Sequence, residues 1–248
     1  MAVVAVYSVK GGVGKTTIAA NLAWSSAAIS CRRTLLWDLD AAGGAGFLFG
    51  VDPRRKHSAG TVFAKDVDPA ELVRKTAVPR LDLLPADESL RELDSLLARL
   101  GKKRRLAKLG EELAQRYERI ILDCPPVLNE ISAQVIRAAD CVIVPLPPSP
   151  LSTRAFETVA GEIRAHARDH PPILPVLSMV DARRTLHRQA REEHPDWPVI
   201  PLASAVEQCA VRQQPLGEFA SGSPAAKGFG QLWTAIERKL TQRPKPKS

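Results

Sequence analysis

Val9-Lys10-Gly11-Gly12-Val13-Gly14-Lys15-Thr16-Thr17 is the stretch that decides the fold. A Val-rich run at residues 2–7 precedes it, and a helix-like run follows it over residues 16–29. This order predicts a glycine-rich bend between a strand and a helix, which points backbone N–H groups and the positive helix end at one spot. The sequence therefore predicts a polyphosphate site at the bend.

The residue types in the bend indicate how a nucleotide would be held. Lys15 is placed to reach the terminal phosphates as a point charge, and the Thr16 hydroxyl is placed to ligate Mg²⁺. The usual P-loop pattern has glycine where this chain has Val9, and the chain carries an additional lysine directly after it. The residues predicted to contact ATP here are Lys10, Gly11, Gly12, Val13, Gly14, Lys15, Thr16 and Thr17.

The string KGGVGKTT at residues 10–17 resembles the deviant P-loop of the ParA/MinD family of partitioning and positioning ATPases. The resemblance implies that Lys10 crosses a dimer interface to touch the nucleotide of the partner subunit, and so acts in catalysis beside Lys15. The alternative is a solvated lysine beside a glycine-rich turn. Residues 145–151 also resemble the Pro-x-x-Pro-Ser-Pro-Leu stretch of small plasmid-type ParA proteins.

Carboxylates follow two of the predicted strands. Residues 33–37 lead into Asp38 and Asp40, and the apolar residues 119–122 end at Asp123. Open α/β sheets bind ligands at the carboxyl ends of their strands, so these side chains are expected to meet the nucleotide. We predict that Asp123 and Asp38 stand on the metal side with Thr16, although a loop or capping role is the alternative for Asp38.

The position of Asp40 matches the switch motif of the family, which usually runs Asp-x-Asp-Pro-Gln-Gly. The resemblance implies that Asp40 positions or activates the attacking water and is catalytic. Ala41 and Ala42 replace the Pro-Gln pair. The aspartate is therefore kept, but the family's loop response to nucleotide is not implied for this chain. The resemblance also implies that Met179 and Pro201 line the two sides of an adenine pocket.

Strand-like and helix-like segments alternate along the chain. This alternation predicts an α/β fold with a doubly wound, mostly parallel sheet flanked by helices, as in P-loop ATPases of the ParA/MinD type. One domain is expected over residues 1–240, followed by a basic disordered tail at 241–248. Beyond the strands named above we expect strands at 80–85, 141–145 and 173–179, helices at 89–100, 106–117, 130–139, 153–167 and 225–240, a flexible 41–46, and a surface loop from 51 leading to a helix near 69–75.

A formal net charge of +8 favours a polyanionic partner, although overall charge also serves solubility. Arg188 and Arg191 are three residues apart and share a helix face, in a cluster that follows the strand expected at 173–179. Against DNA binding, residues 202–205 read Leu-Ala-Ser-Ala where many ParA proteins carry arginines. A solvated helix face is the alternative for each cluster. The residues predicted to bind DNA are Arg183, Arg184, Arg188, Arg191, Arg212 and Lys227.

Cysteine spacing and hydropathy exclude several classes of site. Cys31, Cys124, Cys141 and Cys209 are far apart and form no CxxC pair, so neither a zinc site nor a disulfide framework is expected. No apolar run approaches the length of a transmembrane helix, and no membrane anchor is expected. The predicted location is the cytoplasm, in association with the nucleoid.

Together with these features, the resemblance to the ParA/MinD family implies an ATPase that uses ATP and Mg²⁺, forms an ATP-dependent homodimer and binds DNA non-specifically. Hydrolysis is expected to be weak and to be stimulated by a ParB-like or other adaptor protein, and to drive segregation or positioning of a plasmid, a chromosome or another cargo. Two alternatives stay open: a MinD-like ATPase that cycles on a membrane, and an ATP-dependent scaffold with little hydrolysis.

Overall fold

The computed structural model describes residues 1–53, 57–64, 67–101, 104–166 and 170–242. Within them one sheet of eight strands runs in the order β3-β4-β2-β5-β1-β6-β7-β8. Every neighbouring pair is parallel except β3 and β4, which confirms the expected mostly parallel sheet. The strands are β1 (Ala2–Val6), β2 (Thr34–Asp38), β3 (Arg74–Lys75), β4 (Leu81–Leu84), β5 (Arg119–Asp123), β6 (Cys141–Leu146), β7 (Ile173–Val180) and β8 (Val199–Pro201).

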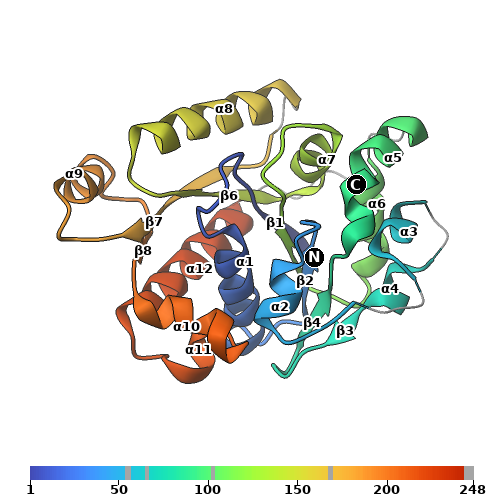
Figure 1. The fold of residues 1–248 in the computed structure, drawn as a ribbon, viewed down its shortest axis with the longest axis horizontal. Helices are drawn as coiled ribbons and strands as arrows, with labels where there is room; N and C mark the ends of the chain where they lie inside the picture. The colour runs from blue at the N-terminus through green and yellow to red at the C-terminus, as the bar shows by residue number, and fades with distance from the viewer. Residues whose placement is uncertain (54–56, 65–66, 102–103, 167–169, 243–248) are drawn as a thin grey trace.

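Helices cover both faces of this sheet (Figure 1). A π-helical turn, Ser25–Ile29, continues α1, and a 3-10 turn, Glu88–Glu92, leads into α5. The helices are α1 (Lys15–Trp24), α2 (Gly44–Leu48), α3 (Ala59–Ala64), α4 (Pro69–Leu72), α5 (Leu93–Leu100), α6 (Arg105–Leu113), α7 (Glu130–Ala138), α8 (Pro150–His166), α9 (Thr185–Glu193), α10 (Ser204–Arg212), α11 (Leu216–Phe219) and α12 (Pro224–Gln242).

Two hydrophobic cores fill the spaces between the sheet and its helices. Successive side chains of a strand point to opposite faces, so Val3 and Ala5 of β1 join the core beneath α3 and α5 to α8. Val4 and Val6 join the other core, beneath α1, α2 and α10 to α12. Strands that are apolar on both faces are typical of a parallel sheet between two helix layers, and this burial explains why β1 reads as a continuous Val-rich run.

Three predicted segments need correction, and three elements were not predicted. The predicted loop after residue 51 contains α3, because Val62 and Phe63 are buried in the core. The segment expected to be flexible, 41–46, contains the start of α2, whose Ala45 is buried. Helix α12 continues through residues 241 and 242, which we expected in a disordered tail; the rest of that tail, 243–248, lies outside the described residues. Strand β8 and helices α10 and α11 were not expected from the sequence at all.

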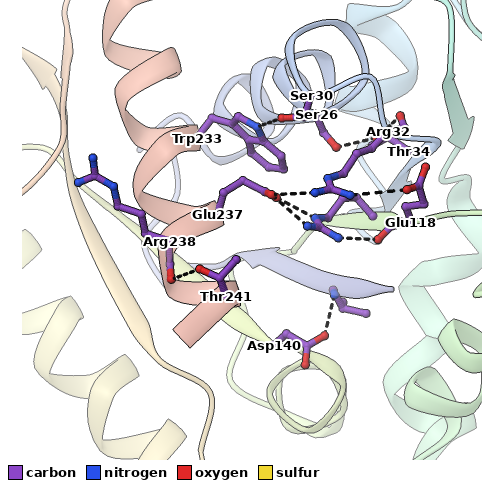
Figure 2. A network of polar contacts seen from close by, with 12 residues as sticks. Ser26, Ser30, Arg32, Thr34, Glu118, Asp140, Trp233, Glu237, Arg238 and Thr241 are labelled. Atoms are coloured by element: carbon purple, nitrogen blue, oxygen red, sulfur yellow. Dashed lines mark hydrogen bonds and ion pairs between the residues drawn. The ribbon is translucent and has the colours of Figure 1, made fainter. Parts of the chain in front are cut away.

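Helix α12 is tied to the amino-terminal ends of the strands by a polar network (Figure 2). The Arg119 guanidinium donates from Nε and Nη2 to the two carboxylate oxygens of Glu237, at 2.9 and 3.1 Å. Arg32 also donates to Glu237, at 3.4 Å, and Trp233 donates from its indole to the Ser30 hydroxyl at 2.8 Å. Two-point contacts of this kind fix geometry as well as adding energy.

Glu237→Ala is expected to lower the free energy of unfolding by about 1–3 kcal/mol, because it leaves the largely buried Arg119 guanidinium without its carboxylate. Urea denaturation checks this. The matched control is Glu157→Ala on the exposed side of α8, which should change stability by less than about 0.5 kcal/mol. Equal stability of the two variants would show that the network contributes no net energy.

Two absences concern the described part of the chain. No helix there is long and apolar enough to cross a membrane. The four cysteines form no disulfide there, and Cys31 alone of them is exposed.

Candidate nucleotide site

The glycine-rich bend lies between the end of β1 and the start of α1. Gly12 and Gly14 adopt left-handed φ angles of 70° and 88°, which other residues adopt only with strain. Gly14 is the N-cap of α1, so the following backbone N–H groups are free of the preceding helical turn and point outward. The Ser178 hydroxyl at the end of β7 donates to the Val13 carbonyl at 3.2 Å and holds the loop against the sheet. The bend therefore has the form of an anion cradle.

Lys15 is the first residue of α1 and is almost completely buried, at 7 % exposure. Its ammonium donates to the Lys10 carbonyl at 3.4 Å. Burial lowers the pKa of Lys15, while the nearby carboxylates of Asp123 and Asp40 act in the opposite direction. A buried cation that faces the helix N-terminus is suited to an anion.

Two carboxylates lie side by side where the central strands end. Asp38 of β2 pairs in register with Asp123 of β5, and Asp123 pairs with Val6 of β1, directly before the bend. Asp38 is fully buried and accepts hydrogen bonds from the backbone N–H groups of Asp40 and Ala45, at 3.1 and 3.0 Å. Burial raises the pKa of Asp38 to about 7. Asp38 thus both stands beside Asp123 and fixes the loop that leads into α2.

Asp123 is the side chain whose surroundings best fit a bound cation. It is fully buried, and neither carboxylate oxygen has a hydrogen-bond partner in the described residues, although the Thr16 hydroxyl lies near enough to favour the charged form. Burial, and then the charge of Asp38, raise the pKa of Asp123 well above its ordinary value. A buried carboxylate is expected to be paired or to bind metal. Hard oxygen donors of this kind, a hydroxyl and carboxylates, fit Mg²⁺.

The described residues contain no group of three or more His, Cys, Asp or Glu side chains arranged to hold a metal by themselves. In a P-loop magnesium site, phosphates and water provide most of the ligands.

Asp40 lies in the loop between β2 and α2 and is half-buried. One oxygen of its carboxylate accepts from the Ala42 backbone N–H at 3.1 Å, and its carbonyl accepts from the Gly43 N–H at 2.9 Å. Helix α2 then begins against the bend: a Cβ at Gly44 would lie 3.1 Å from Cγ2 of Thr16. The loop that carries Asp40 is thus in contact with the residue that we expect to ligate the metal.

Lys10 does not point into open solvent. Its ammonium donates to the hydroxyls of Ser152 and Ser149, at 3.1 and 3.4 Å, and these two hydroxyls are 2.8 Å apart. Both serines lie at the start of α8, and sequence reasoning missed them. The only local signal was the proline-rich stretch at 147–151, which does not indicate a partner for a lysine 139 residues earlier in the chain.

A cavity of about 180 Å³ lies beside the bend and is mostly apolar. Its lining brings Met179 and Pro201, the two residues expected at the adenine ring, together with Gly14 and Thr17. Met179 adopts a φ of 54°, which is unusual for a residue that is not glycine. The cavity thus places apolar walls next to the phosphate cradle.

The six residues predicted to bind DNA do not form one cluster. Arg183, Arg184, Arg188 and Arg191 lie exposed on and before α9, where the Arg188 guanidinium donates to the carbonyls of Ala182 and Arg183, at 3.2 and 3.1 Å. Arg212 lies at the end of α10, 4.9 Å from the ring centre of Phe219, and Lys227 lies on α12. Figure 1 shows α10 and α11 on the other side of β8 from α9.

The sequence of this chain is similar to those of known ATP-binding and partitioning proteins. A family model described as an AAA domain matches residues 1–173. The chain is 29 % identical to the chromosome partitioning protein ParA of Myxococcus xanthus, over 99 % of this chain and 90 % of that protein. Sequence similarity of this extent covers the bend, both carboxylate strands and the later strands.

The fold is also similar to those of solved structures. Cobyrinic acid a,c-diamide synthase from Mycobacterium smegmatis, with a bound ATP analogue and magnesium, superposes with a TM-score of 0.79 at 26 % identity, over 98 % of this chain and 96 % of that one. Apo McdA from Cyanothece has a TM-score of 0.81 at 21 % identity, over 97 % and 99 %, and shows the fold alone. With the deviant bend, the carboxylates and the sheet order in place, these findings show that the chain belongs to the ParA/MinD family of P-loop ATPases.

Proposed function

We propose that residues 1–240 form one ATPase domain that binds ATP with Mg²⁺, forms an ATP-dependent sandwich dimer and hydrolyses ATP to segregate or position a cargo on the nucleoid. The observation that carries the proposal is Asp123, a buried carboxylate beside Thr16 and Lys15 whose two oxygens have no hydrogen-bond partner among the described residues. A buried carboxylate is stabilised by a bound cation, which here would be the metal that accompanies a nucleotide.

The residues divide the work of phosphoryl transfer between them. The amides of the bend and Lys15 hold the phosphates, and the cavity at Met179 and Pro201 receives the adenine. Thr16, Asp123 and Asp38 would hold Mg²⁺, which when bound neutralises charge on the phosphates. Asp40 orients the attacking water, since transfer to water needs placement and charge neutralisation more than covalent chemistry.

Dimer formation is proposed to use Lys10. In the single chain its ammonium is held by the hydroxyls of Ser149 and Ser152, which are neutral and therefore weak partners for a cation. A phosphate of a second subunit's nucleotide is a stronger partner, because its hydrogen bond to the ammonium is charge-assisted. ATP would thus draw Lys10 across the interface.

The direct test is phosphate release. Purified protein with ATP and Mg²⁺ should hydrolyse slowly, and faster when DNA and the cognate adaptor are both present, while Asp123→Ala should remove the activity. An ATP-dependent scaffold would bind ATP and dimerise with no release above background in any of these mixtures. Binding to anionic vesicles in place of DNA would indicate a MinD-like membrane cycle.

DNA binding is proposed to use the four exposed arginines on and directly before α9, whose charges suit a phosphate backbone. Arg188→Glu together with Arg191→Glu is expected to weaken ATP-dependent binding to random duplex DNA at least about tenfold and to flatten its salt dependence. A gel-shift assay at two salt concentrations, with ATP and with ADP, measures both effects.

The matched control reverses the same number of charges on α8, with Arg154→Glu and Arg164→Glu, and should bind DNA as the parent does at moderate salt. Binding that survives the α9 reversal, or that ignores the nucleotide, would remove this surface from the mechanism. Recruitment through the adaptor alone would then be the better account.

A further inference from the structure

A basic recess lies at the edge of the sheet opposite the nucleotide site. It occupies about 680 Å³, and its charged lining residues lie at or shortly before the starts of strands β2, β3, β4 and β5. The bend and the metal-side carboxylates lie at the carboxyl ends of the same central strands. Since five residues of strand separate the two ends, at about 3.3 Å per residue, the recess is a separate site. In Figure 1 its strands β3 and β4 lie at the lower right.

The recess gathers five cationic side chains against one carboxylate: Arg33, Arg74, Lys75, Arg80 and Arg116, with Asp82. Asp82 is already engaged, because its Oδ2 accepts from the Tyr117 hydroxyl at 2.8 Å and from the Lys75 ammonium at 2.9 Å. This buried pair, Asp82 and Tyr117, forms a fixed polar wall. The remaining charge of the recess is therefore almost entirely positive.

Three of the arginines have no ion-pair partner among the described residues. Within the residues that the structure describes, Arg74, Arg80 and Arg116 make no ion pair and no side-chain hydrogen bond. Arg33 has a long contact with Glu118, at 3.8 Å. Like charges that converge on a concave surface repel one another, and an anion bound among them removes that repulsion.

Arg80 is also held in a strained backbone conformation. Its φ is 65°, in the left-handed region where glycine or asparagine is the usual residue. The surrounding turn fixes it: Thr76 donates from its hydroxyl to the Leu81 carbonyl at 2.7 Å, and the Arg80 carbonyl accepts from the Thr34 N–H at 2.8 Å. A charged side chain at a strained position that glycine would occupy more easily points to a role for that side chain.

From the recess and its unpaired arginines we infer a second anion site, for a small ligand that carries two or more linked phosphates. Guanidinium groups bind phosphate oxygens in pairs, and several of them around one recess match a chain of phosphates better than a single one. The volume is that of a small-molecule pocket, whereas duplex DNA is met by an open stripe of charge. The ligand is either inorganic polyphosphate or the polyphosphate of a nucleotide, which share this chemistry.

The test disables the nucleotide site and then measures anion binding at the basic recess. In a Lys15→Ala background, titration calorimetry with sodium tripolyphosphate, without Mg²⁺ and at low salt, is expected to show one binding event. Adding Arg80→Glu and Arg116→Glu should weaken it at least tenfold. Arg154→Glu with Arg164→Glu, the same charge change on α8, should alter it less than twofold.

Two further arms identify the ligand and guard against misfolding. ADP that binds as tightly as tripolyphosphate assigns the site to nucleotides, and tighter tripolyphosphate assigns it to inorganic polyphosphate. Arg80→Gly should also lose affinity while its thermal midpoint stays at or above that of the parent, because glycine relieves the strained φ. Either of two results would overturn the proposal. One is that the folded Arg80→Glu, Arg116→Glu variant binds tripolyphosphate as tightly as its parent. The other is that the protein binds duplex DNA at this recess but does not bind tripolyphosphate.

Discussion

Lys15→Ala is expected to lower the affinity for ATP with Mg²⁺ by about 100-fold or more. The Lys15 side chain is buried at the start of α1, directly after Gly14 of the bend. Charge-assisted hydrogen bonds in such a setting contribute about 1.5–3 kcal/mol each, and each 1.4 kcal/mol is a tenfold change in the binding constant. Calorimetric titration with ATP and Mg²⁺ measures the loss.

Lys227→Ala is the matched control, because it removes the charge of an exposed lysine on α12 and should leave ATP affinity unchanged. Thermal unfolding separates lost binding from lost structure. Retained ATP affinity within a few-fold of the parent, in a folded Lys15→Ala protein, would mean that the bend is not the nucleotide site.

The sheet was predictable from the sequence because its strands are buried on both faces. β1, β2, β5, β6 and most of β7 read as continuous apolar runs, and such runs separated by helix-like segments specify a parallel sheet. The meeting of Asp38 and Asp123 was predictable for the same reason, since parallel strands end at one edge of a sheet.

The missed elements are those that tertiary contacts stabilise. Residues 44–46 read Gly-Ala-Gly and have little helix propensity, yet α2 forms because the Asp38 carboxylate accepts from Ala45 and Gly44 packs on Thr16. β8 is short and ends at Pro201, a residue that argues against a strand in a local reading.

The site itself was predictable as a set of residue types and not as a set of contacts. Two local patterns were enough to predict which residues lie around Asp123. They are the spacing of glycines and lysines in the bend and the acidic residues that follow two strands. The contact between Lys10 and Ser152 joins residues 142 positions apart. No local pattern carries that information, so the conformation of Lys10 had to come from the structure.

Asp40→Ala is expected to bind ATP with near-parent affinity and to reduce hydrolysis at least about 100-fold. The substitution removes a carboxylate that is half-buried beside the site, while the bend, Lys15 and Asp123 remain intact. The attacking water loses its orienting group, and the phosphate cradle is untouched. Phosphate release and ATP titration separate the two effects, with Asp196→Ala, an exposed acid outside the site, as the control.

Because hydrolysis ends the ATP state, Asp40→Ala should also accumulate as an ATP-bound dimer, which light scattering detects. Adding Lys10→Ala should return this dimer to monomer, since the ammonium now held by Ser149 and Ser152 is proposed to reach the partner's nucleotide. Lys10→Ala is therefore tested in the Asp40→Ala background, in which ATP is not consumed. There a change in the amount of dimer reports on assembly and not on turnover. If the fraction of dimer is the same with and without the Lys10 ammonium, Lys10 does not contact the partner's nucleotide. Dimer formation would then depend on surfaces outside the bend.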